Sequence, residues 1–359
     1  MRLIFDAHLD LALFALAYNR DQTETVAQIN EREAGMTDVQ ARGGAVASLP
    51  EMRRGGVAVC QSTVAVRADR GVRPAAGYMR TDLDFATQEM AYAYAQGQLA
   101  YYRVLERQGE IKLIGTVEEL AAHWRRWEAG VDEALPVGII VSMECADPIV
   151  EPTQAQAWWE DGVRSVSLAH FGVSHYAHGT GTNGPLTERG VELLKEFERI
   201  GMILDLTHTA DDSFYQALDC FGGPVLASHT NCRALVPGDR QFADEQIQLL
   251  IQRGAVIGAA LDAWMLIPGF VVGETDPGDL DLEALVDHID HVCQLAGNAE
   301  HAAIGTDTGN AYHMSSDYRT SSDLQKLEAM FERRGYSDAD IDRIFHGNWL
   351  RFFKQWLPA

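Results

Sequence analysis

Short apolar runs rich in β-branched residues alternate with longer amphipathic stretches along the chain. The runs have the length and composition of buried strands, and the stretches have the spacing of helices. Strands are expected at Leu3–His8, Val57–Val64, Val137–Met143, Ser165–Ala169, Met202–Thr207, Val225–Ser228, Val256–Leu261 and Ala303–Thr306. Helices are expected at Asp82–Gln108, Val117–Trp127, Thr187–Ile200, Asp211–Cys220, Ala243–Arg253, Leu282–Leu295, Ser322–Arg333 and Asp338–Trp356.

Eight strands, each followed by a helix, indicate an α/β fold of the (β/α)8 TIM-barrel type, with additional helices at the C-terminus. A doubly wound open sheet is the alternative, but it predicts a glycine-rich phosphate turn after the first strand. The sequence "AHLDLALF" has no such turn. Because the chain also lacks internal repeats and linker-like segments, we expect residues 1–359 to form a single domain.

Acidic and imidazole side chains occur where six of the eight predicted strands end. Strand propensity does not favour histidine or glutamate there, so their recurrence indicates a common site. In this fold the carboxyl ends of the strands meet at one face, which carries the active site. The residues are His8, Asp10, Glu144, His170, His208, His229 and Asp307. Secondary candidates lie in loops at His175, His178 and His313.

Imidazoles and carboxylates without a thiolate favour zinc, manganese or cobalt. Five ligands are too many for one catalytic zinc ion, but they suffice for two ions if one carboxylate bridges them. Glu144 is the expected bridge, with His8 and Asp10 on one ion and His208 and His229 on the other. None of the four lysines ends a predicted strand, which disfavours a carbamylated lysine as the bridge.

The composition limits the partners and the compartment. The formal net charge of −23 disfavours nucleic acid and anionic membranes, because both require a basic surface. The apolar run at the N-terminus is interrupted at Asp6, and no stretch is long enough to span a bilayer. The five cysteines are odd in number and lack CxxC spacing, which is typical of reduced thiols. We therefore expect a cytoplasmic protein with a small-molecule substrate.

The sequence resembles the membrane (renal) dipeptidase family of metal-dependent hydrolases, from "FDAHLDL" to "GNWLRFF". The most specific segments are "GPLTERGVELLKEFERIGMILDLTH" and "GGPVLASHTNCRAL". The resemblance implies that a pair of zinc ions is held by His8, Asp10, Glu144, His208 and His229, with the glutamate shared. It also implies that His170 and Asp307 act in catalysis, that Arg240 binds the carboxylate of the substrate, and that the protein is a homodimer.

Two loops depart from the pattern of that family. Glycines commonly follow the shared glutamate, whereas Cys145 follows Glu144 here. An aspartate commonly stands two residues after the catalytic aspartate, where this chain has Gly309. Both loops are expected to border the pocket, so the metal chemistry is expected to be retained while the substrate preference stays open.

We therefore expect hydrolysis of a dipeptide or a related N-acyl amino acid with a free carboxylate. Asp307 is the expected general base, and His170 is the expected hydrogen-bond donor to the oxyanion. Deacetylation or lactone opening at the same metal site is one alternative. A metal-binding protein without catalytic activity is another, although such a protein has no need of a general base.

Overall fold

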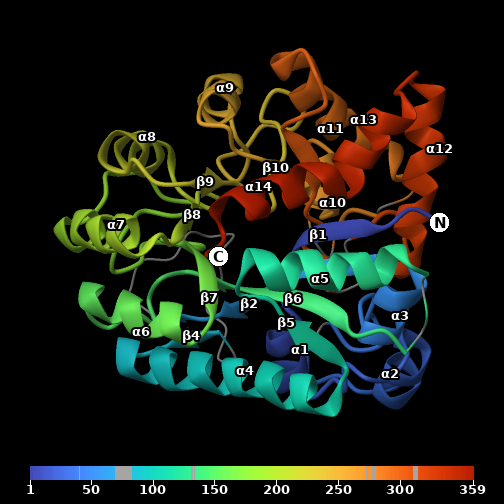
Figure 1. The fold of residues 1–359 in the computed structure, drawn as a ribbon, viewed down its shortest axis with the longest axis horizontal. Helices are drawn as coiled ribbons and strands as arrows, with labels where there is room; N and C mark the ends of the chain where they lie inside the picture. The colour runs from blue at the N-terminus through green and yellow to red at the C-terminus, as the bar shows by residue number, and fades with distance from the viewer. Residues whose placement is uncertain are drawn as a thin grey trace.

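The computed structural model describes residues 1–39, 41–68, 83–130, 132, 134–271, 274–276, 278, 280–309 and 314–359. Parallel strands lie at the centre, and helices surround them (Figure 1). The strands of the wall are β1 (Ile4–Leu9), β2 (Val57–Ala65), β6 (Val137–Glu144), β7 (Val163–Ser167), β8 (Ile203–Asp205), β9 (Val225–Leu226), β10 (Ile257–Ala259) and β11 (Ala302–Ile304). Each overlaps one of the eight predicted strands.

Hydrogen bonds connect the strands around the barrel. Strands β1, β2, β6, β7, β8 and β9 form one sheet in that order, and β10 pairs with β11. A parallel bridge between Ala227 and Ile257 joins β9 to β10. The N–H of Asp307, just after β11, donates to the carbonyl of His8 in β1 at 3.1 Å. The sheet thus closes on itself, which confirms the predicted (β/α)8 barrel.

Three short strands lie outside this wall. β5 (Ile111–Leu113) pairs with the first residues of β6, and β7 pairs with its later residues. β3 (Arg67–Ala68) pairs in parallel with β4 (Asp84–Phe85) just beyond the end of β2. The β3–β4 pair therefore lies at the carboxyl end of the barrel, next to the predicted site.

Helices pack their apolar faces against the barrel. Several begin at a threonine whose hydroxyl accepts a backbone N–H of the first turn, as at Thr87, Thr116 and Thr187. The helices are α1 (Leu11–Tyr18), α2 (Val26–Glu33), α3 (Leu49–Arg54), α4 (Gln88–Gln108), α5 (Val117–Glu128), α6 (Ala155–Glu160), α7 (Glu188–Ile200), α8 (Asp211–Cys220), α9 (Asp244–Gln252), α10 (Ala263–Leu266), α11 (Glu283–Ala296), α12 (Lys326–Arg333), α13 (Asp338–Asp342) and α14 (Asn348–Trp356). None of the described helices is both long and apolar enough to cross a membrane.

A helix occurs within each predicted range, and the structure adds short ones. The range Asp82–Gln108 was wrong at its start, because Asp84–Phe85 forms β4 and the helix begins at Gln88 after the Thr87 cap. The start of Ser322–Arg333 is a 3-10 turn, and α12 begins at Lys326. The expected helix Asp338–Trp356 is continuous, but a π-helical turn at Arg343–Gly347 separates α13 from α14. The sequence did not predict α1, because "LALFALAY" is apolar on nearly every side and has no helical periodicity. It also missed α3 and α6, which are only six residues long.

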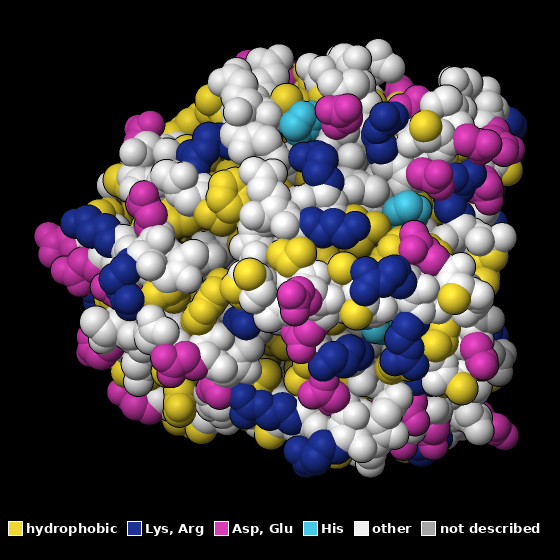
Figure 2. All heavy atoms as spheres, viewed as in Figure 1, with side chains coloured by type: hydrophobic (Ala, Val, Ile, Leu, Met, Phe, Trp, Pro, Cys, Tyr) yellow, Lys and Arg dark blue, Asp and Glu magenta, His cyan; other side chains and the backbone are white. Residues whose placement is uncertain are grey.

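The outer surface is mixed in character. On the face shown in Figure 2, acidic and basic side chains are interspersed, and hydrophobic atoms occur in small groups. The interior of the barrel, in contrast, carries buried polar side chains such as Asp6, Gln61 and Asp205 among its apolar residues. This polar interior leads to the carboxyl ends of the strands, where the candidate site lies.

Candidate metal centre

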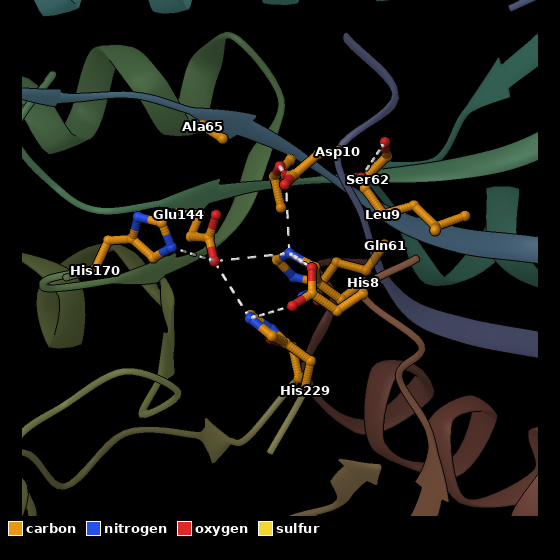
Figure 3. Close-up of polar contacts among 12 residues, drawn as sticks. His8, Leu9, Asp10, Gln61, Ser62, Ala65, Glu144, His170 and His229 are labelled. Carbon is orange, nitrogen blue, oxygen red and sulfur yellow. Dashed lines mark hydrogen bonds and ion pairs between the residues drawn. The ribbon is translucent and has the colours of Figure 1, made fainter. Parts of the chain in front are cut away.

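The carboxyl ends of six strands place the predicted polar residues around one point. His8 lies in β1, and Asp10 follows it as the N-cap of α1. Glu144 is the last residue of β6. The residues after β7, β8, β9 and β11 supply His170, His208, His229 and Asp307. Figure 3 shows His8, Asp10, Glu144, His170 and His229 pointing toward one another, although they are far apart in the sequence.

The carboxylate of Glu144 lies at the middle of the imidazoles. Its Oε1 is 3.2 Å from Nε2 of His229 and 3.3 Å from Nε2 of His208. The same oxygen is 3.6 Å from Nε2 of His170 and 3.7 Å from Nε2 of His8. One carboxylate oxygen therefore adjoins four imidazole nitrogens, which is the position expected of a shared ligand.

Two further carboxylates border the same cluster. Nε2 of His8 is 3.8 Å from Oδ1 of Asp10 and 3.7 Å from Oδ1 of Asp307. On its other side, Asp307 approaches Nε2 of His229 at 3.8 Å. Three overlapping groups could each hold an ion: His8 with Glu144 and His229; Glu144 with His170 and His208; His8 with Asp10 and Asp307.

Hydroxyl groups orient several of these side chains from behind. Thr180 Oγ1 lies 2.9 Å from Nδ1 of His208, and Ser228 Oγ lies 2.8 Å from Nδ1 of His229. The hydroxyl of Thr63 donates to Oδ1 of Asp10. A hydrogen-bond partner on Nδ1 directs Nε2 toward the cluster. Metal-binding histidines usually have such a partner on the ring nitrogen that does not bind the metal.

Strained backbone occurs beside the cluster. Cys145, His208 and Asp307 have φ values of 78°, 65° and 55°, and Asn19 is the one other non-glycine residue with positive φ in the described chain. Side chains rarely adopt this left-handed region, and such strain is typical of functional sites. His208 and Asp307 are themselves members of the candidate metal groups.

Burial and crowding make the carboxylates hard to ionise without a cation. Burial raises the pKa of Glu144 well above its usual value, and the charge of Asp10 adds to this effect. Burial likewise raises the pKa of Asp307, as do the charges of Asp262 and Glu144. Negative charges held this close in a buried site require positive charge for full ionisation.

The imidazoles are shifted toward their neutral form. Burial lowers the pKa of His8 to about 3, and the positive charge of Arg240 acts in the same direction. Burial also lowers the pKa values of His208 and His229 well below the usual value. Neutral imidazole is the form that binds a metal ion. The buried Nδ1 and Nε2 of His8 have no hydrogen-bond partner among the described residues, which also fits a ligand role.

The donor set therefore fits one or two divalent cations. It combines neutral imidazole nitrogens with carboxylate oxygens that need compensating charge, and the described cluster contains no thiolate. Zinc, manganese and cobalt accept such ligands.

Arg240 lies against this cluster with unused hydrogen-bonding capacity. Its side chain is buried, and Nη2 donates to the carbonyl of His229 at 2.9 Å. Nε and Nη1 have no partner among the described residues. Arg233, in contrast, binds Asp211 through both terminal nitrogens and the carbonyls of Gly238 and Gln241 through Nε. Of these two arginines, Arg240 is the one with guanidinium nitrogens that have no partner among the described residues, so it can offer them to an anionic ligand.

Comparison with known families agrees with this geometry. Residues 2–357 match the model of the membrane dipeptidases, peptidase family M19. The chain belongs to this family. Among curated relatives, it is 31% identical over 194 residues to dipeptidase verJ of Clonostachys rogersoniana, an alignment that covers 53% of this chain and 47% of that protein. The chain thus spans about half the length of that relative.

Solved structures of M19 peptidases share the fold. A dipeptidase of this family superposes with a TM-score of 0.80 at 21% identity, covering 100% of this chain and 99% of the other. A metallopeptidase from Rhodobacter sphaeroides, liganded with a phosphinate mimic of the dipeptide L-Ala-D-Ala, has a TM-score of 0.79 at 20% identity, covering 99% of each chain. These matches establish that the whole chain has the M19 barrel fold.

The two departures from the expected M19 pattern have local structural explanations. Cys145 occupies a backbone conformation that favours glycine, and its side chain is buried. At Gly309, an added Cβ would lie 1.9 Å from Cζ of Phe14, so the ring of Phe14 fills the space that an aspartate side chain needs. An aspartate here would therefore require the ring of Phe14, from α1, to move.

The secondary histidine candidates do not join the cluster. Nδ1 of His175 pairs with Oδ1 of Asp147 at 2.9 Å. The ring of His178 packs against Gly184. Neither belongs to the candidate metal groups found in the described part of the chain. His313 lies outside the described residues.

Polar residues that were not predicted as site residues also follow the two remaining strands. Arg67 follows β2, and Asp262 follows β10; both side chains are buried beside the cluster. Arg67 approaches His170, and the charge of Asp262 acts on Asp307. The signal is visible in "VAVRA" and "AALDA", where a charged residue follows the apolar run. Arginine is not a metal ligand, so Arg67 does not fit the pattern of the other strand ends, whereas Asp262 does.

Proposed function

We propose that the protein is a metal-dependent dipeptidase, which hydrolyses the amide bond of a dipeptide or similar N-acyl amino acid with a free carboxylate. The observation that carries this proposal is the buried Arg240, which keeps two unpartnered guanidinium nitrogens beside the metal-ligand cluster. The dipeptide mimic bound by the Rhodobacter sphaeroides neighbour supports the same substrate class.

Five residues would hold two divalent ions. His8 and Asp10 would bind one ion and His208 and His229 the other, with Glu144 shared between them. This assignment is supported by the central position of Glu144 Oε1 among the imidazole nitrogens. Two such ions, when bound, polarise the scissile carbonyl and lower the pKa of a water molecule.

Three other side chains act on the substrate. The carboxylate of Asp307 accepts the proton of the attacking water and returns it to the leaving nitrogen. Nε2 of His170 donates a hydrogen bond to the carbonyl oxygen as negative charge develops there. Arg240 forms a bidentate pair with the terminal carboxylate, so it selects short substrates and orients them.

The proposal extends to the metal, the domain organisation, the oligomeric state and the compartment. The ions are zinc, because imidazole and carboxylate ligands without a thiolate suit it, and manganese or cobalt would fit the same donors. Residues 1–359 form one hydrolase domain, as the closed barrel suggests. The protein is a homodimer, which rests on the family resemblance alone. It works in the cytoplasm, which is consistent with all five cysteines being free.

A substrate panel tests the activity. The protein is reconstituted with zinc or manganese and given dipeptides, their C-terminal amides, N-acetyl amino acids and lactones. We expect release of free amino acids from the dipeptides with a free carboxylate. If only lactones or only N-acetyl amino acids are hydrolysed, the protein is another hydrolase and the dipeptidase assignment is wrong. Metal binding without turnover of any substrate would refute an enzymatic role.

A further inference from the structure

A buried ion pair stands behind His170, on the side away from the metal-ligand cluster. Arg67 and Asp84 are paired in register where β3 meets β4, and the N–H of Arg67 donates to the carbonyl of Leu83 at 2.8 Å. Nε and Nη2 of Arg67 donate to the two oxygens of Asp84 at 2.8 and 2.9 Å. The side chains are only 4% and 0% exposed. The bidentate contact fixes the plane of the guanidinium group.

The remaining nitrogen of this guanidinium reaches His170. Nη1 of Arg67 lies 3.2 Å from Nδ1 of His170. A guanidinium group can only donate hydrogen bonds, and it stays protonated in proteins. Nδ1 of His170 must therefore accept, which requires a lone pair on that nitrogen. In a neutral imidazole the proton then resides on Nε2.

The two neighbouring histidines have a different partner on the same atom. Nδ1 of His208 faces the hydroxyl of Thr180, and Nδ1 of His229 faces the hydroxyl of Ser228. A hydroxyl can accept as well as donate. It therefore permits a proton on Nδ1 and a lone pair on Nε2, which is the arrangement a metal ligand needs.

We propose that Arg67, held by Asp84, is a positioning residue that keeps His170 in the tautomer with the proton on Nε2. This proposal rests on the proposed function, in which His170 donates to the substrate carbonyl. It explains why the fourth imidazole of the cluster, 3.6 Å from Glu144, acts on the substrate and is not a metal ligand. An Nε2 that carries a proton cannot bind a metal ion, but it can stabilise an oxyanion.

The tautomer is measured directly by long-range ¹H–¹⁵N correlation spectra of protein labelled with ¹⁵N-histidine, metal-free and zinc-loaded, with His170→Gln for assignment. We expect His170 to show a bare Nδ1 and a protonated Nε2 in both states. In the zinc-loaded protein, His208 and His229 should show the reverse pattern. A protonated Nδ1 on His170 in the native protein would refute the proposal without any need for a variant.

Variants test the role of the ion pair. Arg67→Met should introduce the second tautomer at His170 and lower kcat by about tenfold to a hundredfold, because the oxyanion loses part of its donor. KM and the bound-metal content should change little. Arg67→Lys retains a donor and should restore part of kcat. Arg164→Met removes an arginine that binds carbonyls at the opposite end of β7, so it should leave the His170 signals unchanged.

Two outcomes distinguish a failure of this proposal from a failure of the proposed dipeptidase function. If Arg67→Met folds, retains metal and leaves the tautomer of His170 unchanged, the ion pair is only structural and the proposal is wrong. If no dipeptide is hydrolysed although the native tautomer is as expected, the proposed function fails, while the positioning of His170 by Arg67 stands. Asp84→Asn provides an independent variant, which should mix the tautomers because the guanidinium loses its charged anchor.

Discussion

Replacing Arg240 by methionine should cost the enzyme its preference for a free carboxylate. Methionine fills the buried volume without a charge or a donor. Native Arg240 has Nε and Nη1 free for the substrate, while Nη2 stays on the carbonyl of His229. A hydrogen bond involving a charged group contributes about 1.5–3 kcal/mol. Since about 1.4 kcal/mol corresponds to a tenfold change, kcat/KM should fall by about 10-fold to 100-fold.

The assay compares one dipeptide with its C-terminal amide on both enzymes. The amide lacks the negative charge, so it should be a poor substrate for the native enzyme and lose little more with Arg240→Met. The ratio of kcat/KM for acid over amide should therefore fall to about one. Two enzymes and two substrates form a double-mutant-type cycle, which isolates the contribution of the guanidinium–carboxylate pair. Arg240→Lys keeps the positive charge but lacks the planar guanidinium group. Its ratio of kcat/KM for acid over amide should lie between the ratios of the native enzyme and of Arg240→Met.

Arg233→Met serves as the matched control in the same loop. Arg233 holds the carbonyls of Gly238 and Gln241, so its loss should loosen the segment that carries Arg240. We expect that variant to weaken acid and amide substrates to a similar degree. If Arg240→Met also weakens both substrates equally, Arg240 has a structural role, and the physical basis for a free-carboxylate preference disappears.

Three further predictions address the metal centre and its strained loop. Glu144→Gln should reduce bound zinc from about two ions per chain to one or none by elemental analysis, since the shared carboxylate is lost; retention of two ions would contradict the bridge. Asp307→Asn should keep the metal but lower kcat by about a hundredfold or more, because an amide cannot accept the proton; near-normal turnover would place the base elsewhere. Cys145→Val should lower the free energy of unfolding by about 1–3 kcal/mol relative to Cys145→Gly, because a β-branched side chain is strained at a φ of 78°. Equal urea midpoints and slopes for the two variants would show that this backbone is not under strain.

The sequence alone was sufficient to predict the barrel and the acidic and imidazole residues that meet at six of its strand ends. Buried parallel strands read as short apolar runs, and a polar residue at the end of such a run is conspicuous. Because all strand ends meet at one face, His8, Glu144 and His229 could be placed together although they are far apart in the chain. Amphipathic periodicity likewise predicted the long helices.

Only the tertiary structure showed which groups support those residues. Thr180 reaches His208 from the loop after β7, and Arg67 meets Asp84 because β4 returns to pair with β3. No local pattern marks such partners, since the contacts depend on how loops fold over the barrel mouth. The backbone strain at Cys145 is equally invisible in the sequence.

The same distinction applies to the space around the site. The sequence showed that Gly309 stands where an aspartate is expected, but not that the ring of Phe14 occupies the space. It contained two arginines in one loop, and their side-chain contacts distinguish them. Two nitrogens of Arg240 have no partner among the described residues, whereas every guanidinium nitrogen of Arg233 has one. Strand order and apolar patterning are local properties that a sequence encodes directly. Packing around a side chain, and the donors it leaves unused, depend on contacts between residues distant in the chain, so only the folded structure determines them.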